Sequence, residues 1–402
     1  MNNFNTVLRG DERVALELRT LYGSRGYSQF KMSKFEEYDL YLRNKDFLIS
    51  DSVITFTNPD GKLMALKPDV TLSIIKNTAD DASQCNKLYY NENVYRAAKG
   101  SRSFKEIMQV GLECIGNVDE FCLCEVLQLA AESLKLISDE CVLDISHLDI
   151  VSKLLSSLEI PEEYSASVLK CIGDKNPYEL SAVCREAGID AEKIAPLKEL
   201  ISLYGAPADV LPRLEKICPA SARDSLLELS RVCSALESYG DVVRIDFSVM
   251  NDMNYYNGIV FKGFLSGIPT GVLSGGQYDK LMQKMGRKAR ALGFAVYLDL
   301  LQRIDENVTE TDFDALLLYS SEDSVAEVFS AAENLRKQGK SVMVQQQKPP
   351  RQSFAEVYKF SELIQWYLSR LLRWCTVHNI STYPFSSDVK IKLSDKLPLP
   401  SL

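Results

Sequence analysis

The sequence predicts an α+β protein in which an antiparallel sheet is flanked by helices, contains a helical insertion and is followed by a small C-terminal α/β segment. The runs 87–95 and 104–116 predict two paired strands joined by a polar loop. Residues 151–239 are almost wholly helical in pattern, although prolines interrupt them. Strand character returns at 242–249 and 258–264. One sheet assembled from both sides of a helical insertion accounts for this order.

The elements before the paired strands are predicted to be short. An amphipathic helix is expected over 11–27, where a glycine near the end closes the apolar pattern. Residues 30–42 look extended. A hairpin is predicted over 53–66, because β-branched and aromatic residues flank the turn Asn58-Pro59-Asp60-Gly61. A short helix is expected at 70–77.

The later elements complete the predicted sheet and its covering helices. Residues 120–137 predict a long helix, and residues 141–145 predict a strand. Short strand-like runs at 271–273 and 293–296 precede a predicted helix at 297–304.

The C-terminal part has a different rhythm. An apolar run, an amphipathic helix and a second apolar run predict one β-α-β unit. No clear period follows it, and no role is assigned to the remaining tail. The predicted division is a core, a helical insertion, a small α/β segment and a tail, at 1–150 with 240–304, 151–239, 312–347 and 348–402, respectively.

Composition excludes several classes of function. The net charge is −9, whereas a protein that grips a long polyanion usually carries a basic face, so nucleic acid is not an expected partner. No apolar run approaches the length that spans a membrane, and the N-terminal residues lack the pattern of a secretory signal. We therefore expect a cytoplasmic protein without a membrane partner.

Cysteine and histidine usage argues against disulfides and metal ions. The chain has 10 cysteines and 2 histidines, and no C-x-x-C pair occurs. Cys122, Cys171, Cys218 and Cys233 lie in apolar helix-like stretches, which is typical of buried thiols in a reducing compartment. With so few imidazole ligands, neither a metal site nor a cofactor is expected.

A first candidate binding motif is Leu66-Lys67-Pro68-Asp69-Val70-Thr71, at a strand-to-helix turn. The carboxyl group of Asp69 and the hydroxyl group of Thr71 can together hold an ammonium group. The alternative, which is the more common arrangement for such residues alone, is that one of them only caps the following helix.

A second candidate motif lies on the predicted strand pair. Gln109, Gly111 and Glu113 alternate onto one face of their strand. The glycine leaves room for a ligand against the backbone, and Arg96 on the paired strand can bind a carboxylate through its forked guanidinium group. A solvated sheet face explains the same alternation equally well.

The third candidate comprises two runs, Tyr255-Tyr256-Asn257-Gly258-Ile259-Val260-Phe261 and Gly275-Gly276-Gln277-Tyr278-Asp279-Lys280-Leu281. Paired tyrosines can wall a planar ligand while their hydroxyl groups meet polar groups. Two glycines let the backbone pass close to that ligand. Each run alone is more often a set of core aromatic residues with a hairpin turn.

In this order and spacing, the three motifs resemble those of histidyl-tRNA synthetase and of its paralogue, the regulatory subunit of ATP phosphoribosyltransferase. The tyrosine and glycine pairs resemble the two histidine-specific motifs of that family. Residues 95–116 resemble class II synthetase motif 2, and Leu292-Gly293-Phe294-Ala295 resembles the start of motif 3. The resemblance covers residues 8–304 and implies a class II aminoacyl-tRNA synthetase-like core, with the insertion matching only in position.

The resemblance also implies a histidine-binding pocket, made of Asp69, Thr71, Arg96, Gln109, Glu113, Tyr255, Tyr256 and Tyr278. The acid and hydroxyl of the first motif would hold the amino group, although Asp69 replaces the family's longer glutamate. The arginine would meet a carboxylate or a phosphate. The glutamine and the glutamate would bind the ammonium and imidazole groups, and the tyrosines would line the ring.

The sequence departs from that of a synthetase where ATP would bind. Adenylate formation needs arginines, because they stabilise negative charge on the α-phosphate. By resemblance, Asn251 and Leu300 occupy the positions of two such arginines. Arg287, Lys288 and Arg290 are nearby cations that offer an alternative. A retained histidine set beside a lost ATP set favours a sensor with no catalytic residues.

The resemblance therefore implies a regulatory subunit that acts with the short catalytic subunit of ATP phosphoribosyltransferase, the enzyme that opens histidine biosynthesis. Histidine would be its feedback effector, and the core would self-associate, as class II cores usually do. Two alternatives stay open: an active histidyl-tRNA synthetase, and a free-standing histidine-binding module.

Overall fold

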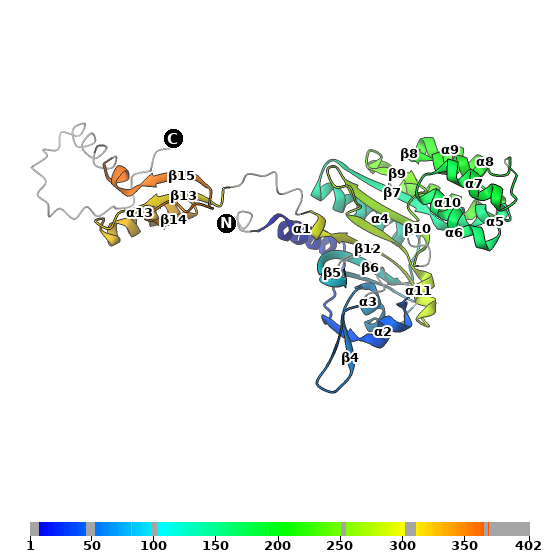
Figure 1. Ribbon diagram of the computed structural model, residues 1–402, viewed down its shortest axis with the longest axis horizontal. Coiled ribbons are helices and arrows are strands. Elements are labelled where there is room, and N and C mark those ends of the chain that lie inside the picture. The colour runs from blue at the N-terminus through cyan, green and yellow to red at the C-terminus, as the bar shows by residue number, and fades with distance from the viewer. Residues whose placement is uncertain are drawn as a thin grey trace, which may run out of the picture. The chain divides into compact units, whose positions relative to one another are not determined.

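The computed structural model describes residues 8–45, 53–81, 83–97, 103–190, 192–250, 255–301, 311–365 and 369. The chain divides into two compact units, Met1–Glu306 and Asn307–Leu402 (Figure 1). The first unit contains every candidate binding residue. The second contains the small α/β segment and the tail.

The first unit is built on a sheet that has nine strands within the described residues, in the order β1-β5-β6-β12-β11-β10-β7-β9-β8 (Figure 1). Neighbouring strands are antiparallel except for β1 with β5 and β7 with β9. The bounds are β1 (Ser28–Gln29), β5 (Cys85–Ala97), β6 (Phe104–Gly116), β7 (Cys141–His147), β8 (Tyr204–Gly205), β9 (Val243–Asp246), β10 (Asn257–Leu265), β11 (Leu273–Gln277) and β12 (Arg290–Tyr297). The predicted strand pair is confirmed as β5 and β6, whereas β11 begins where the run predicted at 271–273 ends.

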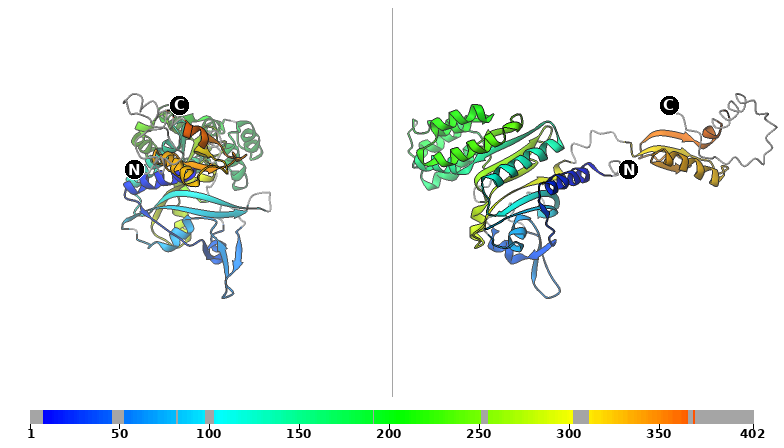
Figure 2. Two further views of the ribbon diagram at one scale, coloured as in Figure 1. Left: turned by 90° about the vertical axis from the view of Figure 1, so that its left-hand side faces the viewer. Right: turned by 180° about the vertical axis from the view of Figure 1, so that it is seen from behind.

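The two faces of this sheet carry different side chains. On β6, Val110 and Leu112 point to one face and are fully buried, whereas Glu113 points to the other. Helices α1 (Gly10–Ser24) and α4 (Glu120–Ile137) pack on the apolar face (Figures 1 and 2). The opposite face carries the candidate binding residues together with a second, smaller apolar core, to which Val94 of β5 and Ile115 of β6 belong.

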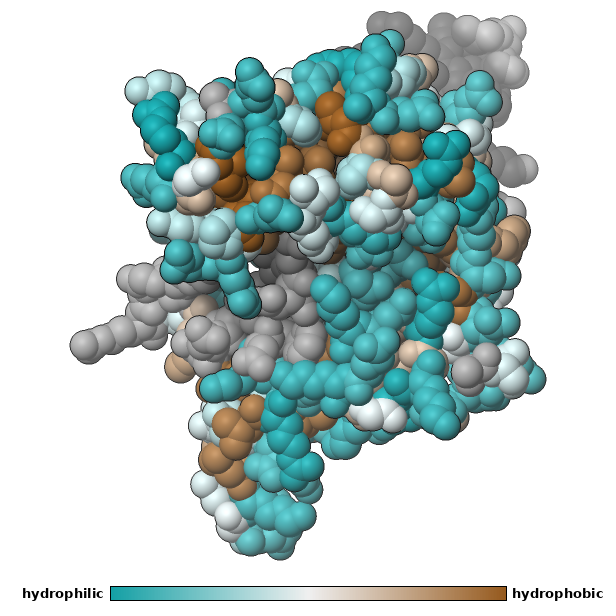
Figure 3. Space-filling model, turned by 90° about the vertical axis from the view of Figure 1, so that its right-hand side faces the viewer, coloured by the Kyte–Doolittle hydropathy of each residue, from teal (hydrophilic) through white to brown (hydrophobic). Residues whose placement is uncertain are grey.

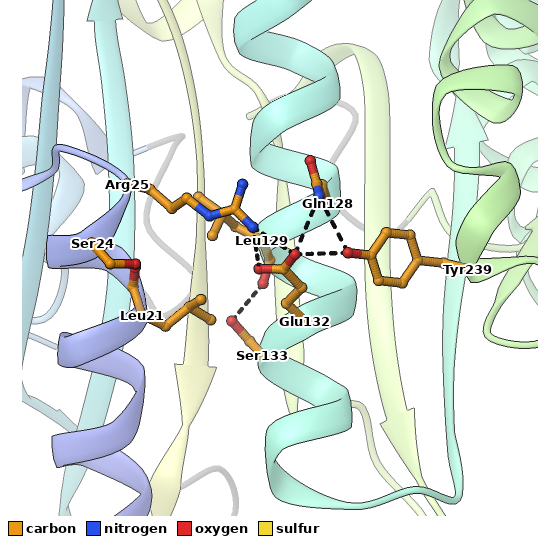
Figure 4. Close-up of polar contacts among 8 residues, drawn as sticks. All are labelled: Leu21, Ser24, Arg25, Gln128, Leu129, Glu132, Ser133 and Tyr239. Atoms are coloured by element: carbon orange, nitrogen blue, oxygen red, sulfur yellow. Dashed lines mark hydrogen bonds and ion pairs between the residues drawn. The ribbon is translucent and has the colours of Figure 1, made fainter.

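Helix α4 connects the sheet to its neighbours. The carboxylate of Asp119 accepts the Cys122 N–H at 2.9 Å and so caps the helix. One turn from its C-terminus, Glu132 accepts hydrogen bonds from Arg25 after α1, at 2.8 Å, and from Tyr239 at the end of the insertion, at 2.7 Å (Figure 4). One carboxylate therefore ties three segments together.

The predicted helical insertion is confirmed and begins slightly before residue 151. Its elements are α5 (Leu148–Ser157), α6 (Glu162–Gly173), α7 (Pro177–Glu186), α8 (Ala195–Ser202), α9 (Pro207–Ile217), η3 (Ala220–Ala222), α10 (Arg223–Ala235) and η4 (Glu237–Tyr239). Pro177 and Pro207 lie in first turns, where the missing N–H has no intrahelical partner to lose. The buried apolar residues of the insertion join the core formed by α4 and the sheet, so the insertion packs onto the sheet.

A second, smaller sheet projects from the first unit. β3 (Thr55–Thr57) and β4 (Leu63–Leu66) form the predicted hairpin, and β2 (Phe35–Glu37) pairs with the other edge of β4. The side chain of Asn58 accepts a backbone N–H across the turn at 2.8 Å, and Gly61 has a φ of 81°. The turn chemistry read from the sequence is therefore the chemistry that closes the hairpin.

The segment after β2 corrects the extended conformation predicted for residues 30–42. Tyr38–Arg43 forms helix α2, because its Tyr41 ring is fully buried in a small core beside the sheet. The predicted helix at 70–77 is confirmed as α3 (Thr71–Asn77). The projecting small sheet keeps exposed apolar groups (Figure 3). Among them are the rings of Phe35 on β2 and Phe56 on β3, whose centroids lie 5.3 Å apart.

In the second unit, the predicted β-α-β unit is confirmed as β13 (Phe313–Leu318), α13 (Val325–Lys337) and β14 (Val342–Gln345). The described part of the tail adds a third parallel strand, β15 (Phe354–Lys359), against the other side of β13. The division predicted at residue 347 therefore falls inside this sheet. β15 was missed because its alternate residues are exposed, so no apolar run marks it.

The helix predicted at 297–304 is wrong in its described part. β12 continues to Tyr297, and a single turn of 3₁₀ helix, η5 (Leu298–Leu300), follows. Residues 302–304 lie outside the described residues. Helix α11 (Asp279–Lys284) lies between β11 and β12. Across the described ranges, no helix combines the length and apolar character needed to cross a membrane.

Candidate functional site

Glycines hollow out the polar face of the sheet. Glu113 on β6 lies opposite Gly293 on β12, and Gly293 lies opposite Gly276 on β11. A Cβ atom on Gly293 would come within 1.8 Å of the Glu113 Oε2 atom. Only glycine at position 293 therefore leaves room for the carboxyl group of Glu113, which lies over this floor.

Glu113 is the centre of a buried polar cluster. Its side chain is 2% exposed, and it accepts hydrogen bonds from the Thr71 hydroxyl at 2.8 Å and from the Tyr278 hydroxyl at 2.6 Å. Asp69 lies beside it, and its Oδ1 atom accepts the Leu72 N–H at 2.9 Å. Asp69 thus caps α3, as the alternative interpretation of the first motif held, while Thr71 reaches across to the sheet.

The cluster contains more acidic groups than nearby cations. Burial raises the pKa of Glu113 to about 8, against the opposing hydrogen bonds from Tyr278 and Thr71, and the charge of Asp69 adds to the increase. Burial also raises the pKa of Asp69, although the Leu72 N–H and the Arg96 guanidinium oppose this. The Arg96 Nε atom donates to the Pro68 carbonyl at 2.9 Å, which holds it beside the first motif. A positively charged ligand group would complete the charge balance.

Aromatic rings enclose the cluster. The ring of Tyr255 lies 4.6 Å from that of Tyr256 and 5.9 Å from that of Tyr278. Tyr255 and Tyr278 are buried, whereas Tyr256 is only partly buried. Tyr90 also lies here and was not predicted. It is 2% exposed, and its hydroxyl group occupies the space that a Cβ atom on Gly111 would need. The pairing of the two predicted strands could have indicated Tyr90, because it lies on β5 directly opposite Gly111.

Gln109 lies on the same face but apart from the cluster. It is 4% exposed and lies four residues from Glu113 along β6, which corresponds to about 13 Å. On the neighbouring strand it pairs with Glu92, which forms an ion pair with Lys67. Lys67 is completely buried and was not singled out by the sequence. The structure therefore places Gln109 in a second polar group rather than against Glu113.

A cavity of about 360 Å³ opens on the polar face beside the cluster. Arg96 and Tyr256 contribute to its walls, and neither Glu113 nor Tyr278 lines it. Its lining also includes Asp144 and Asp246, on strands next to the insertion. Burial, followed by the charge of Asp246, raises the pKa of Asp144 to about 7. These two acids were not predicted, because the sequence marked their strands only by apolar residues.

Comparison with known proteins decides the family. The histidyl-tRNA synthetase family matches residues 8–301. The chain belongs to this family. The regulatory subunit of ATP phosphoribosyltransferase from Syntrophotalea carbinolica is 32% identical over 310 residues, covering 74% of this chain and 71% of the relative. The protein of the same name from Alkaliphilus metalliredigens is 27% identical over 338 residues, covering 81% of this chain and 85% of the relative. Within the family, the chain therefore groups with the ATP phosphoribosyltransferase regulatory subunits.

Solved structures confirm the predicted class II synthetase-like fold. An ATP phosphoribosyltransferase regulatory subunit/histidyl-tRNA synthetase from Bacillus halodurans has a TM-score of 0.72 at 24% identity, covering 87% of this chain and 93% of that one. Histidyl-tRNA synthetase from Nostoc sp. PCC 7120 has a TM-score of 0.65 at 17% identity, covering 92% and 87%. A chain of the ATP phosphoribosyl transferase (HisG:HisZ) complex from Thermotoga maritima has a TM-score of 0.57 at 21% identity, covering 72% and 97%.

Two positions at which the resemblance predicts the ATP-binding arginines of a synthetase hold other residues in this chain, Asn251 and Leu300. Leu300 lies in the 3₁₀ turn after β12, and Asn251 lies outside the described residues. Arg287 donates to the Ile75 carbonyl at 2.9 Å, and Arg290 pairs with Asp279 at 3.1 Å. Neither arginine lines the cavity, whose cationic lining within the described residues is Arg96 and Lys262.

Proposed function

We propose that this chain is a non-catalytic, histidine-binding regulatory subunit that controls a short catalytic subunit of ATP phosphoribosyltransferase in the cytoplasm. The observation that carries the proposal is the buried Glu113 cluster, in which Thr71 and Tyr278 orient a carboxyl group of raised pKa beside Asp69. Such a buried acidic cluster is costly for folding alone and is suited to a cationic ligand.

Histidine carries groups that match the cluster and its surroundings. Asp69 and Thr71 bind its ammonium group, and the guanidinium of Arg96 binds its carboxylate. The imidazole lies between the tyrosine rings with a nitrogen directed at Glu113. Because the bound ligand adds positive charge, it lowers the pKa of Glu113 from its raised value of about 8, and binding at neutral pH releases a proton. Gln109 takes part only if the ligand extends along β6.

The distribution of positive charge supports a role without catalysis. Adenylate formation requires cations fixed at the α-phosphate, where each one contributes about 10²–10³-fold in rate. Leu300 is aliphatic, and Arg287 and Arg290 are held by contacts with Ile75 and Asp279. Arg290 begins β12, whereas Tyr297, which lines the cavity, ends it. The two residues are therefore about 23 Å apart along the strand. The cavity lining includes Asp144 and Asp246 beside the cations Arg96 and Lys262, and a charged acid there would repel a phosphate group.

The partner follows from the family. The related Thermotoga chain belongs to an ATP phosphoribosyl transferase complex, and the similar curated relatives are named regulatory subunits of that enzyme. Feedback inhibition requires histidine to bind the inactive state of the complex more tightly than the active state. Self-association through the class II core supplies a symmetric platform for that complex.

Reconstitution with a short catalytic subunit tests the proposal. Addition of this chain is expected to activate phosphoribosyl transfer, and histidine is expected to inhibit it. Glu113→Gln should keep the activation but weaken inhibition by histidine about 10- to 100-fold, because a charged hydrogen-bond partner is lost. Glu106→Gln, at an exposed position on the same strand, is the matched control and should leave both properties unchanged.

Two other results would reject the proposal in favour of the alternatives. Histidine-dependent ATP–pyrophosphate exchange by the purified chain alone identifies an active synthetase. Histidine binding that depends on Glu113 but leaves the catalytic subunit unaffected identifies a free-standing histidine-binding module. Calorimetry on the isolated chain distinguishes failure of the pocket from failure of the partnership.

A further inference from the structure

Three cysteine side chains meet on the helix-covered face of the sheet, opposite to the Glu113 cluster. Cys85 begins β5, Cys114 lies on β6, and Cys122 lies in the first turn of α4. The Sγ atoms of Cys85 and Cys122 are 3.7 Å apart. The Cys114 sulfur and the Tyr27 hydroxyl form a hydrogen bond of 3.2 Å, in which either group can be the donor. Residues distant in the sequence therefore place three thiol groups together.

The three thiols differ in their access to solvent. Cys114 is fully buried and Cys122 is 5% exposed, whereas Cys85 is only partly buried. A reagent that arrives from solvent therefore meets Cys85 first. The more deeply buried Cys122 has its sulfur 3.7 Å from that of Cys85, and a disulfide would shorten this distance to about 2.05 Å.

The surroundings of Cys85 favour its thiolate form. A hydrogen bond from Cys114 lowers the pKa of Cys85 to about 7, with smaller contributions from a hydrogen bond from Cys122 and from the charge of Lys87. Burial opposes this decrease. The Lys87 ammonium is fixed by its ion pair with Glu125 on α4, at 2.5 Å. Burial raises the pKa of Cys122 to about 12, so this thiol keeps its proton.

We propose that Cys85 and Cys122 form an oxidation site at which a peroxide converts the two thiols into a disulfide. The Cys85 thiolate attacks one peroxide oxygen, the O–O bond breaks, and the departing hydroxide takes a proton to become water. Cys85 is then a sulfenic acid. The Cys122 sulfur attacks the Cys85 sulfur, the S–O bond breaks, and the second water leaves with the Cys122 proton. Two thiols and one hydrogen peroxide thus give one disulfide and two waters.

The disulfide would fasten the start of β5 to the first turn of α4. β6 lies between this site and the polar face, because Cys114 and Glu113 are neighbours on that strand with side chains on opposite faces. Closing a loop between Cys85 and Cys122 restricts the unfolded chain, so the oxidised protein should melt roughly 5 °C higher than the reduced protein.

Alkylation rates test the reactivity of Cys85 in the full chain. Cys124 is also partly buried, but burial raises its pKa, which makes it a matched internal reference. At pH 7, Cys85 should react with iodoacetamide about fivefold faster, because its larger thiolate fraction outweighs its lower intrinsic nucleophilicity. Equal rates for these two cysteines would overturn the assignment of Cys85 as the reactive thiol.

Peroxide treatment followed by mass spectrometry tests the disulfide. Trypsin leaves Cys114, Cys122 and Cys124 in one peptide, so fragmentation of the cross-linked species must locate the bond. The Cys85–Cys122 bond should form in the wild type and in Cys124→Ser. Cys122→Ser should instead accumulate a dimedone-reactive sulfenic acid at Cys85. Absence of a Cys85 cross-link in the folded wild type, or a bond from Cys85 to Cys114 or Cys124, would overturn the proposal.

Discussion

The two faces of the nine-stranded sheet differ in the polar groups that they bury, although the same strands supply both and each face also has an apolar core. On the face under α1 and α4, residues such as Val110 and Leu112 are apolar and completely buried. On the other face, the buried side chains include Glu113, Asp144 and Asp69 near the sheet. The first face lowers the free energy of the folded state by burying apolar area. The second pays a desolvation cost.

The contrast separates residues that stabilise the fold from residues that bind. Removal of an apolar side chain from the first face should reduce stability and leave the intrinsic affinity for histidine unchanged. Removal of an acid from the second face should reduce the affinity for histidine and leave the stability largely unchanged. Four experiments test this separation.

Leu129→Ala, on the buried side of α4, should show the largest loss of stability. Deletion of a fully buried leucine side chain leaves a cavity and lowers the free energy of unfolding by about 2–5 kcal/mol. Urea denaturation measures this loss, and calorimetry on the folded variant should give wild-type affinity for histidine. Leu16→Ala, at a position 50% exposed on α1, is the control. Lost affinity without lost stability would break the separation.

Gly293→Ala should reduce both the stability and the affinity for histidine. Its Cβ atom would lie 1.8 Å from Glu113 Oε2 and 2.4 Å from the Leu112 carbonyl oxygen, so the carboxyl and the backbone must both move. We expect unfolding free energy to fall by about 1–3 kcal/mol and histidine affinity to fall about tenfold or more. Gly23→Ala, in α1 with nothing within 4 Å of its Cβ, should leave affinity unchanged and slightly raise stability.

Stability should fall as pH rises because of the buried acids. The folded-state pKa of Glu113 is about 8 and its ordinary value is 4.5, so the stabilisation linked to its proton is fully present below pH 4.5 and is lost by about pH 8. Between these limits, Glu113 contributes a decrease of up to about 1.4 kcal/mol per pH unit. Asp144, with a pKa of about 7, contributes with the same sign.

Glu113→Gln should remove its share of this slope while retaining that of Asp144. Urea denaturation at a series of pH values between 5 and 8 measures the difference, with Glu106→Gln as the control. An identical slope in wild type and Glu113→Gln would show that the pKa of Glu113 is not raised in the folded protein, and the proton release expected on histidine binding would then not occur.

Tyr278→Phe should produce the smallest of these changes. It removes the hydroxyl that donates to Glu113 at 2.6 Å but keeps the ring, so histidine affinity should fall about three- to tenfold. Tyr89→Phe, on the apolar face of β5, makes the same chemical change as a control. A larger loss in the control than in Tyr278→Phe would contradict the assignment of the binding face.

Sequence reasoning succeeded where local signals and tertiary structure agree. The hairpin around Asn58 and Gly61 is closed by the turn chemistry that the sequence displays. It failed where burial overrode the local pattern, as in α2, where the alternating residues form a helix that buries Tyr41. It also failed at β15, which pairs with β13 although no apolar run marks it in the sequence.

The candidate site shows the same limit. Periodicity placed Gln109 and Glu113 on one face of a strand, but it could not tell that Tyr278 and Thr71 would reach Glu113 while Gln109 would lie beside Glu92 and near Lys67. Those pairings depend on strand register and on where α3 docks. For Asp69 the structure shows the capping contact with α3 and a place beside Glu113, whereas its part in binding an ammonium group stays a prediction.

By itself, the sequence determined the α+β class, the helical insertion and the family-specific motifs, because these are encoded in periodicity, turn residues and spacing along the chain. Tertiary structure alone decided which side chains meet: the glycine floor under Glu113, the buried Tyr90 and Lys67, and the Cys85–Cys122 pair. The physical reason is that contacts across a sheet depend on register and helix docking, which bring together residues that no local pattern connects.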